Sequence, residues 1–124
     1  MDAKHRILLV DDEPALLRIF HTALKIYGYE VVGCTSASEA LERLGQQKFD
    51  LVISDVNMPK CGGLELLQMI RKLHPEIPVI VMTGRPSAEV ERKATERGAF
   101  RFLVKPIMPA NLRSAIESAL QIHS

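Results

Sequence analysis

The feature that most constrains the fold is a regular alternation of short apolar runs with longer amphipathic segments. Most of the runs are rich in Val, Ile and Leu without strict apolar–polar alternation, which is typical of strands buried on both faces of a parallel sheet. The runs cover residues 7–10, 30–34, 49–54, 79–82 and 101–104. Because the second run is more polar than the others, we expect it at an edge of the sheet.

Helical patterns fill the gaps between these runs. We expect helices over residues 14–27, 37–44, 64–73, 87–97 and 110–122. The first begins at Pro14 and ends before Gly28. The second opens with a capping-box pattern, Ser36 to Glu39, and is expected to stop at Gly45.

The helical segments differ in how strongly they are expected to pack. Ile19 in the first and Leu73 in the third fall on apolar stripes at three- and four-residue spacings, so we expect both to be buried. In the segment 87–97, Val90 is the only sizeable apolar side chain. A helix so weakly anchored is expected to be among the least stable parts of the fold, and it could serve as a movable element.

Strand–helix alternation with short connections predicts an α/β fold, a doubly wound parallel sheet with helices on both faces. A chain of 124 residues suits one domain, expected over residues 1–124. The net charge of +1 argues against a dedicated nucleic-acid or membrane-surface binder. No membrane-spanning run or secretory signal pattern is evident. Cys34 and Cys61 have no metal or redox spacing, so we predict a cytoplasmic protein with reduced thiols.

Polar side chains follow four of the five runs. They are Asp11, Asp12 and Glu13 after the first run, Asp55 after the third, Thr83 after the fourth and Lys105 after the fifth. Ligand sites in doubly wound sheets lie beyond the carboxyl ends of the strands, where these groups would meet. Two carboxylates about 4 Å apart repel by roughly 4 kcal/mol at an effective dielectric near 20. One lysine cannot neutralise the three aspartates, so the pattern predicts a divalent cation, with Mg²⁺ fitting best.

The chemistry expected at this site is phosphoryl transfer to a carboxylate. No Gly-x-Gly-x-x-Gly turn or Gly-rich phosphate loop with a lysine is present, and none of the four histidines follows a predicted strand. Asp55 ends the central, most hydrophobic run and could attack a phosphoryl group to form an aspartyl phosphate. Lys105 and Mg²⁺ would stabilise the charge on the transferring oxygens, and Thr83 could donate a hydrogen bond to the new phosphoryl group.

These motifs, taken together, resemble the receiver domains of two-component response regulators, in particular the chemotaxis-type single-domain receivers. The matching segments are residues 10–13, 50–59, 82–84, 98–100 and 102–106. The resemblance covers essentially the whole chain and implies a flavodoxin-like sheet of five strands in the order 2-1-3-4-5, flanked by five helices. It also implies a stand-alone receiver or the N-terminal part of a larger regulator.

The resemblance implies a role for each site residue. Asp55 would be the phosphoacceptor. Asp12 and Asp55 would bind Mg²⁺, or Mn²⁺ in its place, through their side chains. Asn57 would bind the ion through its backbone carbonyl, and Asp11 would act directly or through water.

Three further positions carry implied roles in catalysis and switching. Lys105 would pair with the phosphoryl group, and the peptide bond between Lys105 and Pro106 would be cis. Thr83 would swing toward the phosphoryl group, and Phe102 occupies the aromatic switch position.

The sequence departs from the family pattern at three places. Gly62 stands where an Asp usually caps the third helix, so we expect a more flexible loop. Phe102 has no phenolic hydroxyl and can signal only by packing. Arg85 places a cation two residues after Thr83, where it could alter the lifetime of the aspartyl phosphate or the preference for a kinase.

The leading hypothesis is a phosphorylation-operated switch. A sensor histidine kinase or a histidine phosphotransfer protein would supply the phosphoryl group. The surface of the fourth helix, fifth strand and fifth helix would then change for a downstream partner or an output domain. We expect no membrane contact and no direct nucleic-acid binding by this segment, and homodimer formation on phosphorylation stays open. The domain would catalyse only its own phosphorylation and slow dephosphorylation, so it is interpreted as a non-enzyme.

Two alternatives use the same fold or the same nucleophile. One is a phosphorylation-independent protein-interaction module that resembles a receiver, although every reactive residue is present here. The other is a phosphatase of the haloacid-dehalogenase type. That enzyme would need a second Asp at the position of Asn57, so it ranks well below the others.

Overall fold

The computed structural model describes residues 4–58 and 62–121, in which strands and helices alternate strictly along the chain. The strands are β1 (Arg6–Val10), β2 (Glu30–Cys34), β3 (Leu51–Asp55), β4 (Val79–Thr83) and β5 (Arg101–Val104). The helices are α1 (Pro14–Ile26), α2 (Ala37–Gln46), α3 (Gly63–Leu73), α4 (Ala88–Glu96) and α5 (Pro109–Leu120). Each predicted strand and helix is therefore present.

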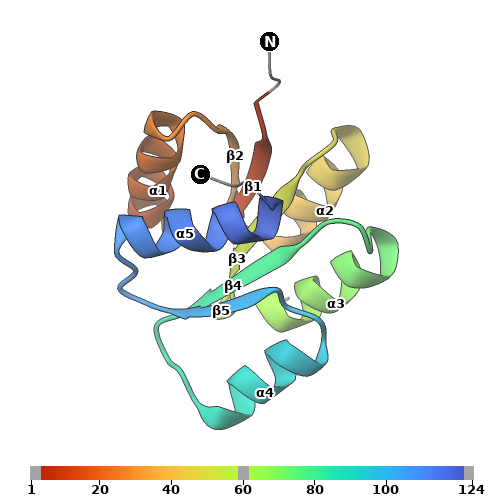
Figure 1. The fold of residues 1–124 in the computed structure, drawn as a ribbon. Coiled ribbons are helices and arrows are strands. Elements are labelled where there is room, and N and C mark those ends of the chain that lie inside the picture. The colour runs from red at the N-terminus through yellow and green to blue at the C-terminus, as the bar shows by residue number, and fades with distance from the viewer. Residues whose placement is uncertain (1–3, 59–61, 122–124) are drawn as a thin grey trace.

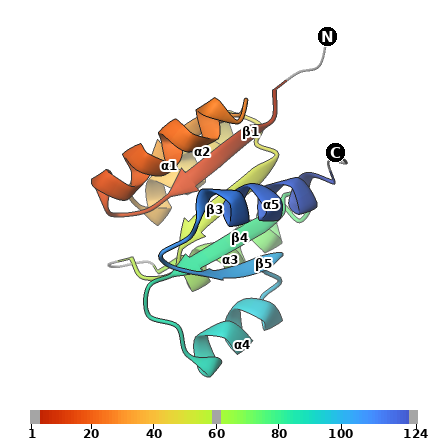
Figure 2. The ribbon, with the colours of Figure 1, turned by 60° about the vertical axis from the view of Figure 1, so that its left-hand side comes forward.

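The five strands form one parallel sheet in the order β2-β1-β3-β4-β5, as the resemblance implied. Helices α1 and α5 cover one face of the sheet, and α2, α3 and α4 cover the other (Figures 1 and 2). The more polar β2 lies at an edge, as predicted from its sequence. The strand order reverses between β1 and β3, so the carboxyl ends of these two strands are the topological switch point of the sheet.

Two hydrophobic clusters, one on each face of the sheet, hold the layers together. Along β1, Ile7 and Leu9 pack in the cluster with α1 and α5, whereas Leu8 and Val10 pack in the cluster with α2 and α3. This alternation follows from the two-residue period of a strand, and it explains why the run at residues 7–10 is apolar throughout.

The structure shifts several expected element ends by one or two residues, and it corrects the expected burial of two side chains. Ile19 and Leu73 are 60% and 62% exposed, because Ile19 lies beside the narrow face that α1 buries and Leu73 is the last residue of α3. Gly45 does not end α2, which continues to Gln46 because the N–H of Gln47 still bonds to the carbonyl of Arg43. Helix α5 spans Pro109–Leu120 instead of residues 110–122, and residue 122 is outside the described part.

Among the described residues, no helix is long and apolar enough to cross a membrane. Cys34 is a buried free thiol at the end of β2. Burial raises the pKa of this thiol from 9.0 to about 11, which suits an unreactive packed residue. Cys61 lies outside the described residues.

Candidate functional site

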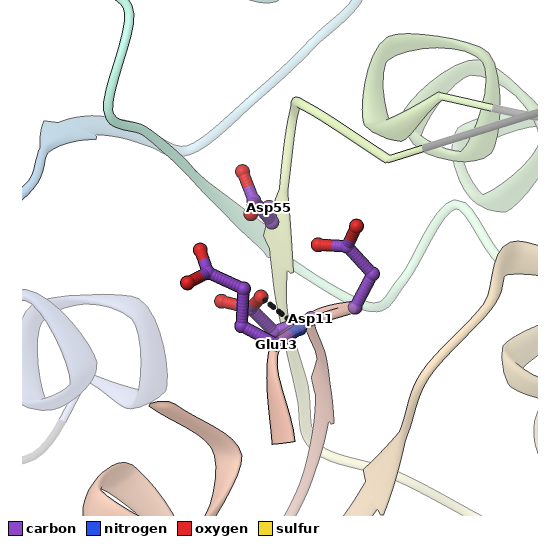
Figure 3. A group of neighbouring side chains, drawn as sticks. Asp11, Glu13 and Asp55 are labelled. Atoms are coloured by element: carbon purple, nitrogen blue, oxygen red, sulfur yellow. Dashed lines mark hydrogen bonds between the residues drawn. The ribbon is translucent and has the colours of Figure 1, made fainter. Parts of the chain in front are cut away.

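The polar residues predicted at the strand ends do meet at one edge of the sheet. Asp11 follows β1, Asp55 and Thr83 are the last residues of β3 and β4, and Lys105 follows β5. Figure 3 shows the side chains of Asp11, Glu13 and Asp55 gathered near these ends. Asp11, Asp55 and Thr83 are at most 2% exposed, although they are polar. Burial on this scale requires internal partners.

Lys105 is the partner of both buried carboxylates. Its Nζ lies 3.0 Å from Oδ2 of Asp11 and 2.9 Å from Oδ2 of Asp55. A third carboxylate, Oε1 of Glu13, is 3.9 Å from the same nitrogen. The ammonium group of Lys105 is thus shared among three acidic side chains. Its peptide bond to Pro106 is cis, as the resemblance implied.

The second oxygen of each buried aspartate is held by the loop that follows it. Oδ1 of Asp11 accepts a hydrogen bond from the N–H of Glu13 at 3.0 Å. Oδ1 of Asp55 accepts one from the N–H of Asn57, also at 3.0 Å. Both carboxylates are therefore fixed in orientation, with one oxygen bonded to backbone and the other to the lysine.

The electrostatics of this group are those of an anionic site short of positive charge. Burial raises the pKa of Asp11, and this outweighs the opposing effect of its hydrogen bonds to Glu13 and Lys105. For Lys105, burial alone would lower the pKa, but the hydrogen bonds to Asp55 and Asp11 prevail and the pKa is raised. Lys105 is thus held firmly in its charged form.

The acidic side chains are close enough to hold one metal ion together. One carboxylate oxygen from each of Asp11, Asp12, Glu13 and Asp55 lies within 4.8 Å of the others. These all-oxygen donors suit a hard divalent cation such as Mg²⁺. Three of the four were predicted as metal ligands or partners, and Glu13 extends that set.

Gly63 brings the start of α3 against the end of β3. A Cβ added at this glycine would overlap the backbone oxygen of Asp55, which no side chain tolerates. The N–H of Gly63 bonds to the carbonyl of Val56 at 3.0 Å. Helix α3 thus begins in direct backbone contact with the end of β3. The sequence showed two adjacent glycines here, but it did not indicate that Gly63 is required by close packing.

Thr83 makes a side-chain contact that the sequence reasoning missed. Its hydroxyl donates a hydrogen bond to Oδ1 of Asn57 at 2.6 Å and accepts one from the N–H of Arg85 at 2.9 Å. The resemblance gave Asn57 a role through its backbone carbonyl only. The contact joins the segment after β3 to the end of β4, and no pattern within one segment could have indicated it.

The two remaining positions of interest lie near the rim of the site. Phe102 is half-buried and packs against the cluster that contains α3 and α4, beside Val81 in the register of β4 and β5. Arg85 is exposed, and its backbone N–H contacts Thr83.

The chain matches the family model described as "Response regulator receiver domain" over residues 7–117. It is 42% identical over 115 residues to the transcriptional regulatory protein GlrR of Escherichia coli K12, which covers 93% of this chain and 26% of that protein. The chain therefore spans about a quarter of the length of this curated relative.

Solved structures of receiver domains match almost the whole chain. The CheY-like response regulator receiver domain protein from Methanospirillum hungatei JF-1 superposes with a TM-score of 0.93 at 34% identity, covering 96% of this chain and 95% of that one. The beryllofluoride-activated NtrC4 receiver domain dimer gives a TM-score of 0.89 at 30% identity, covering 96% and 98%.

Proposed function

The chain belongs to the family of response regulator receiver domains, and we propose that it is a switch operated by phosphorylation of Asp55. The observation that carries this proposal is the buried Asp55 carboxylate, with one oxygen on the N–H of Asn57 and the other 2.9 Å from Nζ of Lys105. A carboxylate oriented in this way beside a permanent cation is suited to attack a phosphoryl group.

The metal that fits the acidic cluster is Mg²⁺, with Mn²⁺ as a substitute. Asp12 and Asp55 would hold the ion through their side chains, Asn57 through its backbone carbonyl, and Asp11 directly or through water. When bound, the ion supplies positive charge that neutralises the phosphoryl oxygens. Lys105 supplies the rest of that charge and orients Asp55.

The phosphoryl donor would be a phosphohistidine on a sensor histidine kinase or a histidine phosphotransfer protein. In the transfer, an oxygen of Asp55 forms a bond to phosphorus while the bond between phosphorus and the histidine nitrogen breaks. The leaving nitrogen keeps the electron pair. The same site would also transfer a phosphoryl group from a small acyl phosphate, whose leaving carboxylate keeps the electron pair.

Phosphorylation would change the surface formed by α4, β5 and α5. Thr83 would turn toward the phosphoryl group and Phe102 would repack, which biases the weakly anchored α4. The recipient would be a downstream partner or an output domain. By analogy with the NtrC4 receiver, homodimer formation would be one response. We place the protein in the cytoplasm, with no nucleic-acid contact by this segment.

A phosphorylation-independent interaction module is the alternative. It would have no need for buried carboxylates arranged around a lysine, which makes it the weaker proposal. In either case we propose that the segment is no enzyme for external substrates, apart from its own phosphorylation and slow dephosphorylation.

The test is intact mass measurement after incubation with Mg²⁺ and acetyl phosphate. We expect the mass of one phosphoryl group to be added, and we expect EDTA or the Asp55→Asn substitution to prevent the addition. The matched control is Asp50→Asn, at the other end of β3, where the carboxylate bonds to the N–H of Arg6. A wild-type protein that gains no mass, or an Asp55→Asn variant that does, would favour the interaction module.

A further inference from the structure

The hydroxyl of Thr83 has a single proton to donate. In the proposed switch, two acceptors compete for it: the side chain of Asn57 and a phosphoryl oxygen on Asp55. The hydroxyl of Thr83 donates to Oδ1 of Asn57 at 2.6 Å and accepts from the N–H of Arg85 at 2.9 Å. A threonine hydroxyl has one proton to donate. Thr83 is fully buried, so its hydroxyl cannot exchange these partners for water without a cost in free energy. In this structure the proton of the Thr83 hydroxyl is therefore used in the hydrogen bond to Asn57.

The proposed switch requires the same proton at another place. A hydrogen bond from Thr83 to a phosphoryl oxygen on Asp55 forms only if the bond to Asn57 breaks. The side-chain carbonyl of Asn57 and the phosphoryl oxygen are therefore competitors for one donor. Competition of this kind sets the balance between two positions of Thr83.

Asn57 contacts both Asp55 and Thr83. Its backbone N–H donates to Oδ1 of Asp55, and its side chain accepts from Thr83. A substitution of the side chain leaves the backbone bond to Asp55 in place. The two functions of this residue can therefore be separated by mutation.

We infer that the side chain of Asn57 is a latch that holds Thr83 in its resting position and so sets how readily phosphorylation switches the receiver. This inference rests on the proposed function of Asp55 and adds a positioning residue to it. Without the latch, the phosphoryl group gains the hydrogen bond of Thr83 with no bond to Asn57 lost in exchange. The switched state is then favoured by the net contribution of one hydrogen bond, about 2- to 12-fold in an equilibrium constant.

The experiment is a double-mutant cycle with beryllofluoride as the phosphoryl analogue. The four proteins are the wild type, Asn57→Ala, Thr83→Val and the double variant. The Mg²⁺ affinity of each is measured first, and beryllofluoride is then titrated at Mg²⁺ concentrations that saturate each protein. Binding is followed by NMR through the backbone amide of residue 57, which bonds to Asp55 whatever the side chains at positions 57 and 83. Where Thr83 is present, its turning is followed through the amide of Arg85, which loses its acceptor when Thr83 turns.

Two results are expected. In Asn57→Ala, the Arg85 resonance without beryllofluoride moves toward its position in the bound wild type, and beryllofluoride binds about 2- to 12-fold more tightly. In the Thr83→Val background, Asn57→Ala has no such effect on binding, because the hydroxyl that it releases is absent. The control Asn111→Ala, an exposed position on α5, leaves the Arg85 resonance of the free protein in place.

An effect of Asn57→Ala of equal size in both backgrounds would overturn the latch, since it would show that Asn57 acts without Thr83. An unchanged Arg85 resonance in Asn57→Ala would overturn it as well. Failure of the proposed function looks different. Wild-type protein would then neither bind beryllofluoride nor gain mass from acetyl phosphate, and the latch would fall together with that function.

Discussion

The central strands of the sheet, β3 and β4, are buried far more completely than the rim, which consists of β5 and α4. All five residues of β3 and all five of β4 are buried, and these strands end in Asp55 and Thr83. At the rim, no residue of β5 is fully buried, and α4 buries Ala94 alone. The groups that need fixed positions are thus at the centre. The surface proposed to respond to phosphorylation lies where few contacts oppose a change.

The interactions within α4 support this contrast. Two ion pairs at i, i+4 spacing, Lys93–Glu89 and Arg92–Glu96, lie on exposed parts of the helix. Exposed pairs of this kind contribute roughly 0.3–0.5 kcal/mol each. They help the segment to form a helix, but they do not attach it to the sheet. We therefore expect a small free-energy change to be sufficient to move or loosen α4.

The strictest test of the tight centre is Gly63→Ala. We expect the free energy of unfolding to fall by about 3 kcal/mol or more, because a Cβ would overlap the backbone oxygen of Asp55. Urea denaturation followed by circular dichroism measures this change. The control is Gly45→Ala, where a Cβ meets nothing within 4 Å and about 0.5 kcal/mol of stabilisation is expected. Equal stabilities for the two variants would contradict a tightly packed centre.

A second test asks whether tight packing extends to the buried end of the edge strand β2. The pKa of Cys34 is about 11 in the folded protein against 9.0 as its ordinary value. Its contribution to stability is complete below pH 9 and is lost as the pH rises toward 11, in total about 2–3 kcal/mol. Urea denaturation between pH 8 and pH 11 should show a steeper loss in the wild type than in Cys34→Ala. Parallel curves would mean that the thiol is accessible to solvent.

A third test asks how much the buried carboxylate of Asp11 lowers the free energy of unfolding. Burial raises the pKa of Asp11 above the ordinary aspartate pKa of 3.8. The contribution of Asp11 to stability therefore falls as the pH rises above 3.8. At pH 7 with EDTA present, Asp11→Asn should raise the free energy of unfolding by about 1 kcal/mol. The control Asp50→Asn should not stabilise, because its carboxylate accepts a bond from Arg6. A destabilised Asp11→Asn would show that the bonds to Lys105 and Glu13 outweigh the cost of burial.

The smallest effect is expected at the rim. Arg92→Ala removes an exposed ion pair with Glu96 and should change the free energy of unfolding by less than about 0.5 kcal/mol. Hydrogen exchange should nevertheless show faster exchange for the amides of α4 than for those of β3, in both wild type and variant. Equal protection of the two elements would break the contrast between centre and rim.

The sequence predicted the strands, their polar ends and the meeting of those ends, because parallel strands bring their carboxyl ends to one edge. The positions of Asp11, Asp55, Thr83 and Lys105 next to one another follow from this rule alone. Prediction from the sequence failed where the outcome depends on geometry between segments. Whether Ile19 faces the sheet depends on how α1 is rotated. The bond from Thr83 to Asn57 joins two residues that lie 26 positions apart along the chain.

The pairing of Lys105 with Asp11 spans 94 residues, and its pairing with Asp55 spans 50. During synthesis from the N-terminus, both carboxylates leave the ribosome well before the lysine that neutralises them. A nascent chain ending at β4 would have the strands of the core but an uncompensated anionic edge. The last strand therefore completes the charge balance as well as the sheet, and the carboxylate of Asp55 acquires its protein cation only after the rest of the sheet has been made.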